Sequence, residues 1–521
     1  MTRARIVAVA IAATALTGCS AGSKPPAQAS APTGAASAAV TGGSTASAHP
    51  LAWHACPSSV GNGVPGAGAL RCAALQVPLN YEQPSGRKIT LALSELPATA
   101  PAGQQQGVLL VNPGGPGASG LSLPATVAGV LSRPVAADYD IIGFDPRGVG
   151  SSVPALHCDP GFFARPRPDY VPSGAAAEQA MEQRARAYAA GCEQRFGWLL
   201  PYMTTRDDAE DMDSIRAALG VPQISYLGYS WGTYLGQVYG TLYPRRVRRM
   251  VLDSVVDPEG AWYADNIAQD YAFQARVSAF WAWAGAANAT FHLGSTPAQV
   301  EAAYARVVAR VLAHPIAGVV GPDELSDTIL DGGYDNELWP DLATALSAYL
   351  NQGQGGDLVT LYQAVGVQGE NEFAVYNATE CSDVDWPRSW ATWDADTRKV
   401  YATAPFEAWA NAWFNAACAF WPVKGPARPM RIDGAGLPPV LMIQGTLDAA
   451  TPYAGALVAR RLLPSARMVV IVGGGNHGQS LSSPPNSCVL GYLNRYLGNG
   501  AVPASSALIS ARCPALPAPA A

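Results

Sequence analysis

Short apolar segments recur along the chain, and each ends at a loop that carries glycines or a polar residue suited to chemistry. Segments of this length with almost continuous apolar character are typical of strands buried on both faces of a parallel sheet. Helix-compatible sequence separates them, so the pattern predicts an α/β fold with a mostly parallel, doubly wound sheet. The expected strands include residues 107–111, 224–227, 249–252, 440–443 and 468–472.

Between residues 257 and 435 the rhythm of strands is replaced by segments with helical spacing. We expect this stretch to form a helical cap inserted into the core, where it would cover the carboxyl ends of the strands and shape a substrate cleft. The tryptophans near its end are expected to form the interior of the cap and not the wall of the cleft. The helical segments are 271–281, 297–313, 338–351 and 408–414, and the core is expected over 51–256 and 436–521.

A charged segment of the core, from Thr205 to Leu219, is also compatible with a helix. Thr205 and Asp208 have the spacing of a capping box at its start. We expect an exposed helix whose acids take no part in catalysis.

The strongest chemical signal is the motif G-x-S-x-G, formed by Gly228, Ser230 and Gly232 at the end of an apolar strand. A serine on a sharp strand-to-helix turn needs small residues on both sides, because the turn brings neighbouring backbone close. Such a turn exposes the serine Oγ and aims the first amides of the helix at the group that it attacks. The pattern predicts a nucleophile at Ser230; the alternative is a purely structural turn.

A serine nucleophile of this type requires an acid and then a histidine further along the chain. Asp448 follows the strand that begins at Val440, and His477 follows the next strand, which ends at Val472. Strand, carboxylate, strand and imidazole in this order predict a Ser230, Asp448, His477 triad at the carboxyl edge of the sheet. Asp253, at the end of another strand, is the alternative acid.

An oxyanion hole is expected where the strand over 107–111 runs into the loop Asn112-Pro113-Gly114-Gly115-Pro116-Gly117. The residue after the nucleophile, Trp231, would supply one N–H donor, and Gly115 would supply the second. Proline has no N–H, which excludes the two prolines of the loop. The alternative is a tight turn with no role in binding.

Composition and charge exclude several classes of partner. A net charge of −6 over 521 residues, with no basic run interleaved with aromatic residues, argues against nucleic acid. The sequence has no H-E-x-x-H, C-x-x-C or Walker motif, so we expect no metal and no cofactor.

The N-terminal region indicates export from the cytoplasm. Arg3 and Arg5 precede an apolar run that has the length of a signal-peptide core, and Leu16-Thr17-Gly18-Cys19 resembles a bacterial lipobox. We therefore expect residues 1–19 to be a lipoprotein signal peptide, with Cys19 lipidated and anchoring the protein to a membrane. An ordinary secretory signal is the alternative. Residues 20–50, rich in alanine, serine, glycine and proline, are expected to form a flexible tether.

The motifs taken together resemble the α/β-hydrolase branch that contains proline iminopeptidases and secreted tripeptidyl aminopeptidases. Pro113 stands where the iminopeptidases usually carry histidine, which favours the tripeptidyl branch. The stretches that carry the resemblance are 112–117, 139–152, 228–234, 418–422 and 445–452, together with the cysteines at 488 and 513.

This resemblance implies an α/β-hydrolase fold and a secreted or surface-anchored serine exopeptidase. It would remove tripeptides, or shorter units, from peptides with a free N-terminus, and we expect it to act as a monomer. The same branch contains esterases, so a carboxylesterase or lipase on the same triad is the alternative. A non-catalytic surface binding protein is a third possibility, against which an intact triad argues.

Recognition of a free α-amine requires a carboxylate, because a buried ammonium without a partner is costly. Glu380 and Asp383 flank Cys381, in a segment that resembles one near the end of the cap in the tripeptidyl family. They are the candidates for this anchor; the alternative is that they are solvated acids in a loop.

The cysteine count agrees with an oxidising compartment. Nine cysteines less Cys19 leave eight, an even number. Their spacing suggests four local disulfides, although the sequence alone permits other pairings. The expected pairs are Cys56 with Cys72, Cys158 with Cys192, Cys381 with Cys418, and Cys488 with Cys513.

Overall fold

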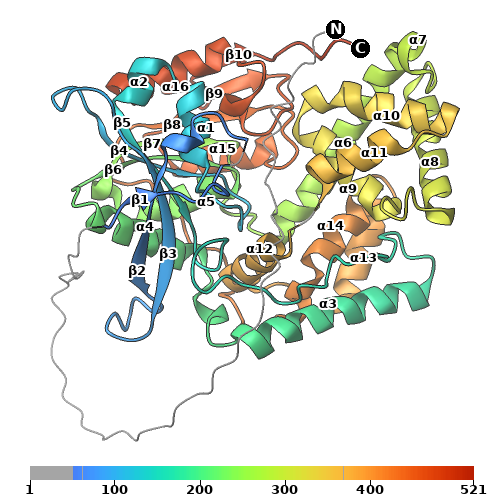
Figure 1. The fold of residues 1–521 in the computed structure, drawn as a ribbon, viewed down its shortest axis with the longest axis horizontal. Coiled ribbons are helices and arrows are strands. Elements are labelled where there is room, and N and C mark those ends of the chain that lie inside the picture. The colour runs from blue at the N-terminus through green and yellow to red at the C-terminus, as the bar shows by residue number, and fades with distance from the viewer. Residues whose placement is uncertain (1–50, 62, 368) are drawn as a thin grey trace, which may run out of the picture.

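The computed structural model describes residues 51–61, 63–367 and 369–521, in which one ten-stranded sheet lies beside a body of helices (Figure 1). The strand order is β1-β2-β3-β5-β4-β6-β7-β8-β9-β10. From β5 to β10 all neighbours pair in parallel. β1, β2, β3 and β5 pair in antiparallel fashion. The strands are β1 (His54–Ala55), β2 (Arg71–Pro78), β3 (Lys88–Leu96), β4 (Gly107–Asn112), β5 (Tyr139–Asp145), β6 (Ile224–Tyr229), β7 (Val247–Asp253), β8 (Val440–Gly445), β9 (Arg467–Val472) and β10 (Ala511–Pro514).

The predicted strands are the central strands of this sheet. β6 and β8 are buried at every position, as their apolar sequences predict. The mostly parallel sheet of the predicted fold class is confirmed. The antiparallel strands β2 and β3 were not predicted, because exposed or partly exposed residues interrupt their buried positions and no long apolar run marks them.

Helices cover both faces of the sheet, which makes it doubly wound. Leu109 and Val111 of β4 pack with the helices of one face, and Val108 and Leu110 pack with those of the other. This alternation is the period-two geometry of a strand with two covered faces. The first face carries α1 (Leu123–Val130), α2 (Arg133–Ala137) and α16 (Ser487–Asn499), and the second carries α4 (Thr205–Ala218), α5 (Trp231–Leu242) and α15 (Tyr453–Leu462).

Helix α4 differs from its prediction. Its N-cap is Thr204, whose side chain accepts a hydrogen bond from the N–H of Asp207. The capping box predicted at Thr205 and Asp208 is therefore displaced by one residue from the observed cap. Asp208 and Asp211 are buried and not exposed, and the buried guanidinium of Arg147 binds Asp211 at 2.8 and 2.9 Å. The charges of this helix therefore balance a buried arginine.

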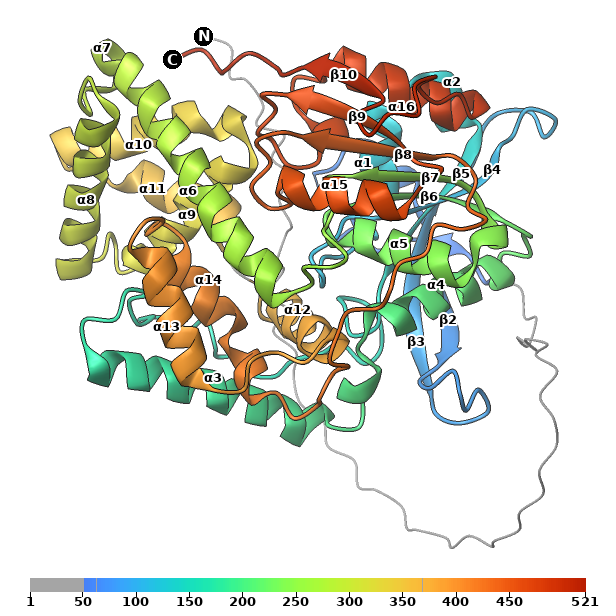
Figure 2. The ribbon, with the colours of Figure 1, turned by 180° about the vertical axis from the view of Figure 1, so that it is seen from behind.

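The chain between β7 and β8 forms the helical body beside the sheet (Figures 1 and 2). Part of it has a hydrophobic core of its own, built from α6 to α11. Trp409 and Trp413 are buried, as expected, and they pack against Met181 and Ala185 of α3 (Ala175–Phe196), a helix that precedes β6. The helices of the body are α6 (Tyr263–Ala286), α7 (Asn288–Phe291), α8 (Pro297–Ala313), α9 (Pro322–Tyr334), α10 (Trp339–Gln352), α11 (Gly356–Leu361), α12 (Glu370–Asp383), α13 (Trp390–Tyr401) and α14 (Ala408–Asn415).

Shorter helical segments complete the fold. One of them, η4, follows directly on α9 and leads into α10. They are η1 (Ala67–Ala69), η2 (Leu200–Tyr202), η3 (Pro244–Arg246), η4 (Asn336–Leu338), η5 (Tyr362–Gly366), η6 (Ala416–Phe420) and η7 (Gln479–Leu481). Within the described part of the chain, no helix has the length and apolar character needed to cross a membrane.

Four disulfides join the pairs of cysteines that the spacing suggests. The last of them holds Cys513 of β10 to α16, and the tail beyond it runs towards the helical body (Figure 2). There the indole N–H of Trp283 donates to the carbonyl of Pro519 at 3.0 Å. The C-terminal tail therefore contacts both the sheet and the cap. The predicted lipidation site Cys19 and the expected tether lie outside the described residues.

Candidate active site

Ser230 occupies a strained turn between β6 and α5. Its backbone angles are φ 54° and ψ −128°, a region that residues other than glycine rarely adopt. A Cβ at Gly228 would lie 2.3 Å from the carbonyl oxygen of Gly232, and a Cβ at Gly232 would lie 2.6 Å from Asn112 Oδ1. Both positions must be glycine because neighbouring segments lie too close for a side chain. This is the physical reason for which the sequence predicts small residues on both sides of the serine.

The loop after β4 packs directly against this turn. The N–H of Gly114 donates to Asn112 Oδ1 at 2.9 Å, and Gly114 and Gly115 adopt φ values of 101° and 108°. A Cβ at Gly114 would lie 2.5 Å from the carbonyl oxygen of Tyr229 and 2.9 Å from Ser230 Cβ. The loop that carries Gly115 therefore borders the nucleophile turn.

Trp231 is the first residue of α5, so its N–H has no acceptor within the helix and is free to bind a developing anion. Its side chain is buried and donates its indole N–H to Thr205 Oγ1 at 3.1 Å. The amides of Gly115 and Trp231 thus come from two segments in contact, as an oxyanion hole requires.

Asp448 and His477 are brought together at the carboxyl ends of β8 and β9. Nδ1 of His477 lies 2.9 Å from Asp448 Oδ1 and 3.1 Å from Oδ2. The Asp448 side chain is fully shielded from solvent, whereas 15% of the His477 side chain is exposed. The aspartate can therefore orient the ring while one edge of the ring stays open.

The electrostatic surroundings of His477 favour its protonated form. Burial lowers the pKa of the imidazole, but the charge and hydrogen bond of Asp448, together with the charge of Asp253, outweigh burial and raise the pKa above its ordinary value. Such an arrangement would stabilise the imidazolium that a serine triad forms when the serine gives up its proton.

Asp253, the alternative acid, is engaged elsewhere. Its Oδ1 accepts from the N–H of Gln479 at 3.0 Å, and its Oδ2 accepts from the N–H and Oγ of Ser480 at 2.8 and 2.6 Å. These bonds hold the segment that follows His477, so Asp253 supports the histidine loop without contacting the ring.

The histidine loop also packs on the nucleophile turn. The N–H of Gly478 donates to Ser254 Oγ at 2.8 Å, and the hydroxyl of Tyr229 pairs with Ser480 Oγ at 3.2 Å. Among the described residues, no hydrogen bond joins Ser230 Oγ to His477. Contacts of this kind are often long without substrate and tighten in the reacting complex.

Comparison with known proteins places these residues in a family. Residues 107–482 match the alpha/beta hydrolase fold family. The chain is 42% identical over 446 residues to a tripeptidyl aminopeptidase of Streptomyces lividans, which covers 83% of this chain and 82% of the relative. It is 33% identical over 489 residues to the serine protease Hip1 of Mycobacterium tuberculosis, covering 88% and 90%. The chain belongs to the α/β-hydrolase family.

Within this family the protein is a serine hydrolase of the peptidase class, related to the tripeptidyl aminopeptidases. It is also 33% identical over 457 residues to a carboxylesterase B of Mycobacterium tuberculosis, covering 84% of this chain and 85% of the relative. The matched segment begins at β4 and ends just after His477, so it includes every residue of the predicted catalytic site.

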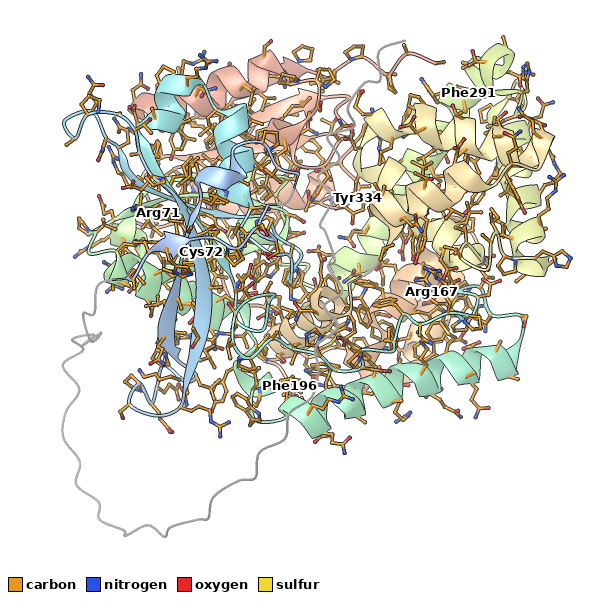
Figure 3. All side chains as sticks on the ribbon, in the orientation of Figure 1. Arg71, Cys72, Arg167, Phe196, Phe291 and Tyr334 are labelled. Atoms are coloured by element: carbon orange, nitrogen blue, oxygen red, sulfur yellow. A yellow bond between two sulfur atoms is a disulfide. The ribbon has the colours of Figure 1, made fainter. Side chains whose placement is uncertain are left out.

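The cap of this hydrolase contributes a residue that the sequence did not indicate. The carbonyl of Tyr334, at the end of α9, accepts the main-chain N–H of His477 at 2.8 Å. The two rings lie 5.5 Å apart and nearly perpendicular. Figure 3 shows Tyr334 where the helical body faces the sheet. Because Tyr334 lies far from His477 along the chain, no local sequence pattern could have predicted this contact.

The candidate amine anchors lie on helix α12, so they are not acids of a solvated loop. Glu380 is 3% exposed, and its Oε2 has no hydrogen-bond partner among the described residues. Asp383 accepts from the N–H and Oγ of Thr205 at 2.7 and 2.6 Å and from the indole of Trp262 at 3.3 Å. Glu380 therefore has a free acceptor, whereas Asp383 caps the start of α4.

A third carboxyl on the same helix was not predicted. The main chain of Glu372 packs against the oxyanion loop, where a Cβ at Gly117 would lie 2.5 Å from its carbonyl oxygen. Burial alone raises the pKa of the Glu372 carboxyl to about 7. Because no cationic partner of that carboxyl is found in the described part of the chain, it is a further candidate for binding a substrate ammonium.

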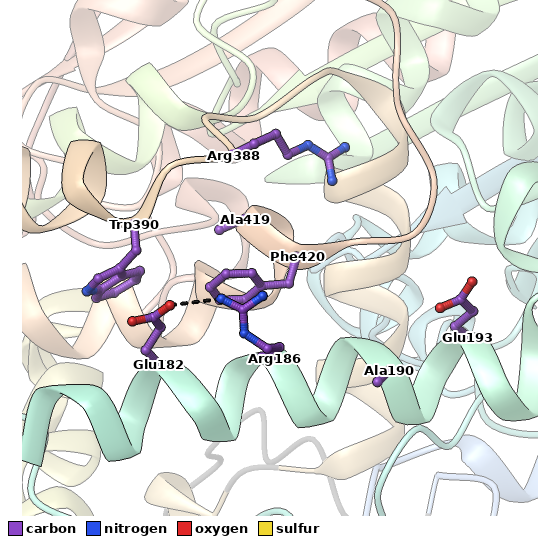
Figure 4. Close-up of a pocket in the computed structure, with 8 residues that line it drawn as sticks. All are labelled: Glu182, Arg186, Ala190, Glu193, Arg388, Trp390, Ala419 and Phe420. Atoms are coloured by element: carbon purple, nitrogen blue, oxygen red, sulfur yellow. Dashed lines mark hydrogen bonds and ion pairs between the residues drawn. The ribbon is translucent and has the colours of Figure 1, made fainter.

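A groove of about 370 Å³ lies away from these residues, between α3 on one side and Arg388 and η6 on the other (Figure 4). Glu182 and Arg186, one turn apart on α3, form an ion pair at 2.9 Å on one side of it, and the Arg186 guanidinium lies 4.0 Å from the centre of the Phe420 ring. None of the predicted catalytic residues lines it.

Proposed function

We propose that this serine hydrolase is an extracytoplasmic aminopeptidase that releases tripeptides, or shorter units, from free N-termini. The observation that carries the proposal is the hydrogen-bonded pair of His477 and Asp448 beside the strained turn of Ser230. The similarity to a tripeptidyl aminopeptidase over most of both chains supports the substrate class.

The proposed reaction begins when His477 takes the proton of Ser230 as Oγ attacks the scissile carbonyl. Asp448 holds the imidazole in the required tautomer and stabilises its charge. The amides of Gly115 and Trp231 donate to the oxyanion of the tetrahedral intermediate. The C–N bond then breaks, the departing amine takes the proton from His477, and an acyl-enzyme remains. Water activated by His477 releases the N-terminal product.

A carboxylesterase activity is the second candidate, because the same triad cleaves esters and one relative is a carboxylesterase. Purified protein should therefore be assayed on free and N-acetylated peptides of two to six residues and on short p-nitrophenyl esters. We expect hydrolysis of the free peptides with tripeptide release, and no hydrolysis of the acetylated ones. Equal rates on free and acetylated peptides, or turnover of esters alone, would refute the aminopeptidase proposal.

The nucleophile is tested by Ser230→Ala. Because Ser230 is only partly buried and its Oγ is proposed to contribute to chemistry and little to packing, we expect a loss of at least about a thousandfold in rate with unchanged thermal stability. Turnover close to that of the wild type would remove Ser230 from the mechanism.

The proposed amine site is the acidic side of α12. Burial, together with the nearby charges of Asp383 and Asp265, raises the pKa of Glu380 well above its usual range. A bound ammonium would supply the missing counter-charge, so the carboxyl would ionise as the substrate enters. We therefore propose Glu380 as the acidic end of the cleft, with Asp383 beside it as a structural acid bound to Thr205 and Glu372 nearer the reacting carbonyl.

The variants Glu380→Gln, Asp383→Asn and Glu372→Gln test this site on a free tripeptide amide and on a short acyl ester. Glu380→Gln should lower kcat/KM on the peptide by about tenfold or more and leave the ester unaffected, because the ester has no ammonium. Asp383→Asn should mainly lower stability, since its carboxylate already binds Thr205. Glu182→Gln, on the surface of α3, is the matched control. Equal losses on peptide and ester would contradict an ammonium site.

The proposed location is the outer face of a membrane, with the lipid on Cys19 as the anchor. The four disulfides support an oxidising compartment. Two or more acyl chains on one cysteine exceed what stable anchoring needs.

A further inference from the structure

A set of hydrogen bonds joins the cap to the loop of the catalytic histidine. The main-chain N–H of His477 donates to the carbonyl of Tyr334 at 2.8 Å. The N–H of Asn336 donates to Asn476 Oδ1 at 3.1 Å, and Asn476 Nδ2 donates to Asp335 Oδ1 at 3.0 Å. These five residues form the cap–histidine junction, and its central side chain, Asn476, is 8% exposed.

A buried arginine of helix α6 braces both sides of this junction. The guanidinium of Arg276 donates to Asn336 Oδ1 and, through Nε, to the carbonyl of Gly333 at 3.4 Å. It also covers Gly475, where a Cβ would lie 2.4 Å from Arg276 Cζ. Arg276 is 4% exposed and makes no ion pair among the described residues, although the charges of Asp448 and Asp335 reach it.

The junction determines where the imidazole lies. The Nδ1 side of the His477 ring is held by Asp448, while the main chain at this residue is held by the cap through Tyr334. In the part of the chain that the structure describes, no hydrogen bond joins the ring to Ser230. A small displacement of the cap would therefore shorten or lengthen the distance between the imidazole and Ser230 Oγ, over which the proton is transferred. A displacement of about 1 Å in a reacting geometry is enough to change a rate by about a hundredfold.

We propose that Asn476 and Arg276 are positioning residues of the hydrolytic reaction, which couple the cap to His477 so that the position of the cap sets proton transfer from Ser230. This inference rests on the proposed triad. It adds to that proposal a route by which substrate held in the cap completes the catalytic geometry.

The first test reverses the polarity of one hydrogen bond. Asn476→Asp would place a carboxylate against that of Asp335, and we expect kcat to fall by about ten- to a hundredfold. Combining it with Asp335→Asn restores a donor and an acceptor, so the double variant should recover most of the loss. The loss in kcat should be the same on the tripeptide amide and on the p-nitrophenyl ester, with KM unchanged, because both substrates need the same proton transfer.

Rates are to be expressed per active serine, counted by complete labelling with a small fluorophosphonate, so that an unfolded fraction does not enter kcat. The rate of that labelling is a second readout, since the probe needs an activated serine and makes little use of the cleft. Labelling by Asn476→Asp should be slowed by a similar factor.

The second test uses the charge of Arg276. Asp448 and Asp253 act on the His477 ring through their charges, the Tyr334 ring packs against it, and the Arg276 guanidinium interacts with the charge of Asp448. Replacing the guanidinium in Arg276→Met removes the only cation of that set, so the acid limb of the labelling rate should move to higher pH. The matched control is Arg310→Met, which removes a cap arginine that donates to the carbonyl of Leu350 on α10, and it should leave the limb in place.

Three results would overturn the inference: a wild-type kcat per active serine in Asn476→Asp, a loss confined to the peptide with a raised KM, or no recovery in the double variant. The last two would assign the junction to substrate binding and to simple stability, respectively. Failure of the proposed function is distinguishable, because it would appear as turnover in Ser230→Ala.

Discussion

At the scale of residues, we expect the charges around His477 to determine the pH dependence of the enzyme, as the proposed mechanism requires. The imidazole must be neutral to accept the serine proton, and Asp448 and Asp253 raise its pKa. It therefore stays protonated to a higher pH than a free imidazole, whose pKa is about 6.5. The acid limb of kcat/KM should lie above that value, as a pH profile on a tripeptide amide will show.

Asp448→Asn separates the two acids. Losing this charge should lower the pKa of His477, move the acid limb to lower pH, and reduce kcat by about 10⁴-fold because the tautomer is no longer held. Asp253→Asn should shift the limb slightly in the same direction and lower the rate only mildly, since this acid binds the Gln479 and Ser480 amides. The reverse order of severity would transfer the acid role to Asp253.

At the scale of elements, the contact between the β4 loop and the β6–α5 turn would form the proposed oxyanion hole. Gly114→Ala would introduce a Cβ 2.5 Å from the carbonyl oxygen of Tyr229, at a residue whose φ is 101°. Because the clashing atom belongs to the main chain, it cannot move aside as a flexible side chain could. The loop must move, and loss of a donor should lower kcat by about 10²- to 10³-fold.

Gly129→Ala in α1 is the matched control for that prediction, because nothing lies within 4 Å of its added Cβ. It should leave activity unchanged and raise stability by up to about 1 kcal/mol, as expected for alanine in a helix. Steady-state kinetics and thermal unfolding of both variants decide the matter. An active Gly114→Ala enzyme would show that the loop has no role in the reaction.

At the scale of the whole molecule, export and anchoring can be tested in cells. Cys19→Ala should prevent lipid attachment and shift the protein from the membrane fraction to the medium, or leave it unprocessed. Non-reducing peptide mapping of the mature protein should find no free thiol among the eight remaining cysteines. Unchanged fractionation would indicate an ordinary signal peptide, and a free Cys381 or Cys418 would contradict the disulfide between them.

The sequence by itself determined the parts of this protein that depend on neighbours along the chain. A buried strand that leads into a glycine-flanked serine, and later strands whose following loops carry Asp448 and His477, are local patterns. In a parallel sheet the carboxyl ends of strands share one edge, so three local patterns predict one site. The spacing of the cysteines likewise suggested the pairs that the structure contains.

Only the tertiary structure decided what depends on contacts between distant segments. Asp208 and Asp211 are buried because Arg147 approaches α4 from another segment and balances their charge. A charged face of this helix therefore lies in the interior, although its sequence predicts an exposed one. Tyr334 and Arg276 contact the histidine loop because α9 and α6 of the helical body pack against the loop that follows β9. No periodicity records such contacts, since the residues that make them are separated by long stretches of chain and meet only when both bodies are packed.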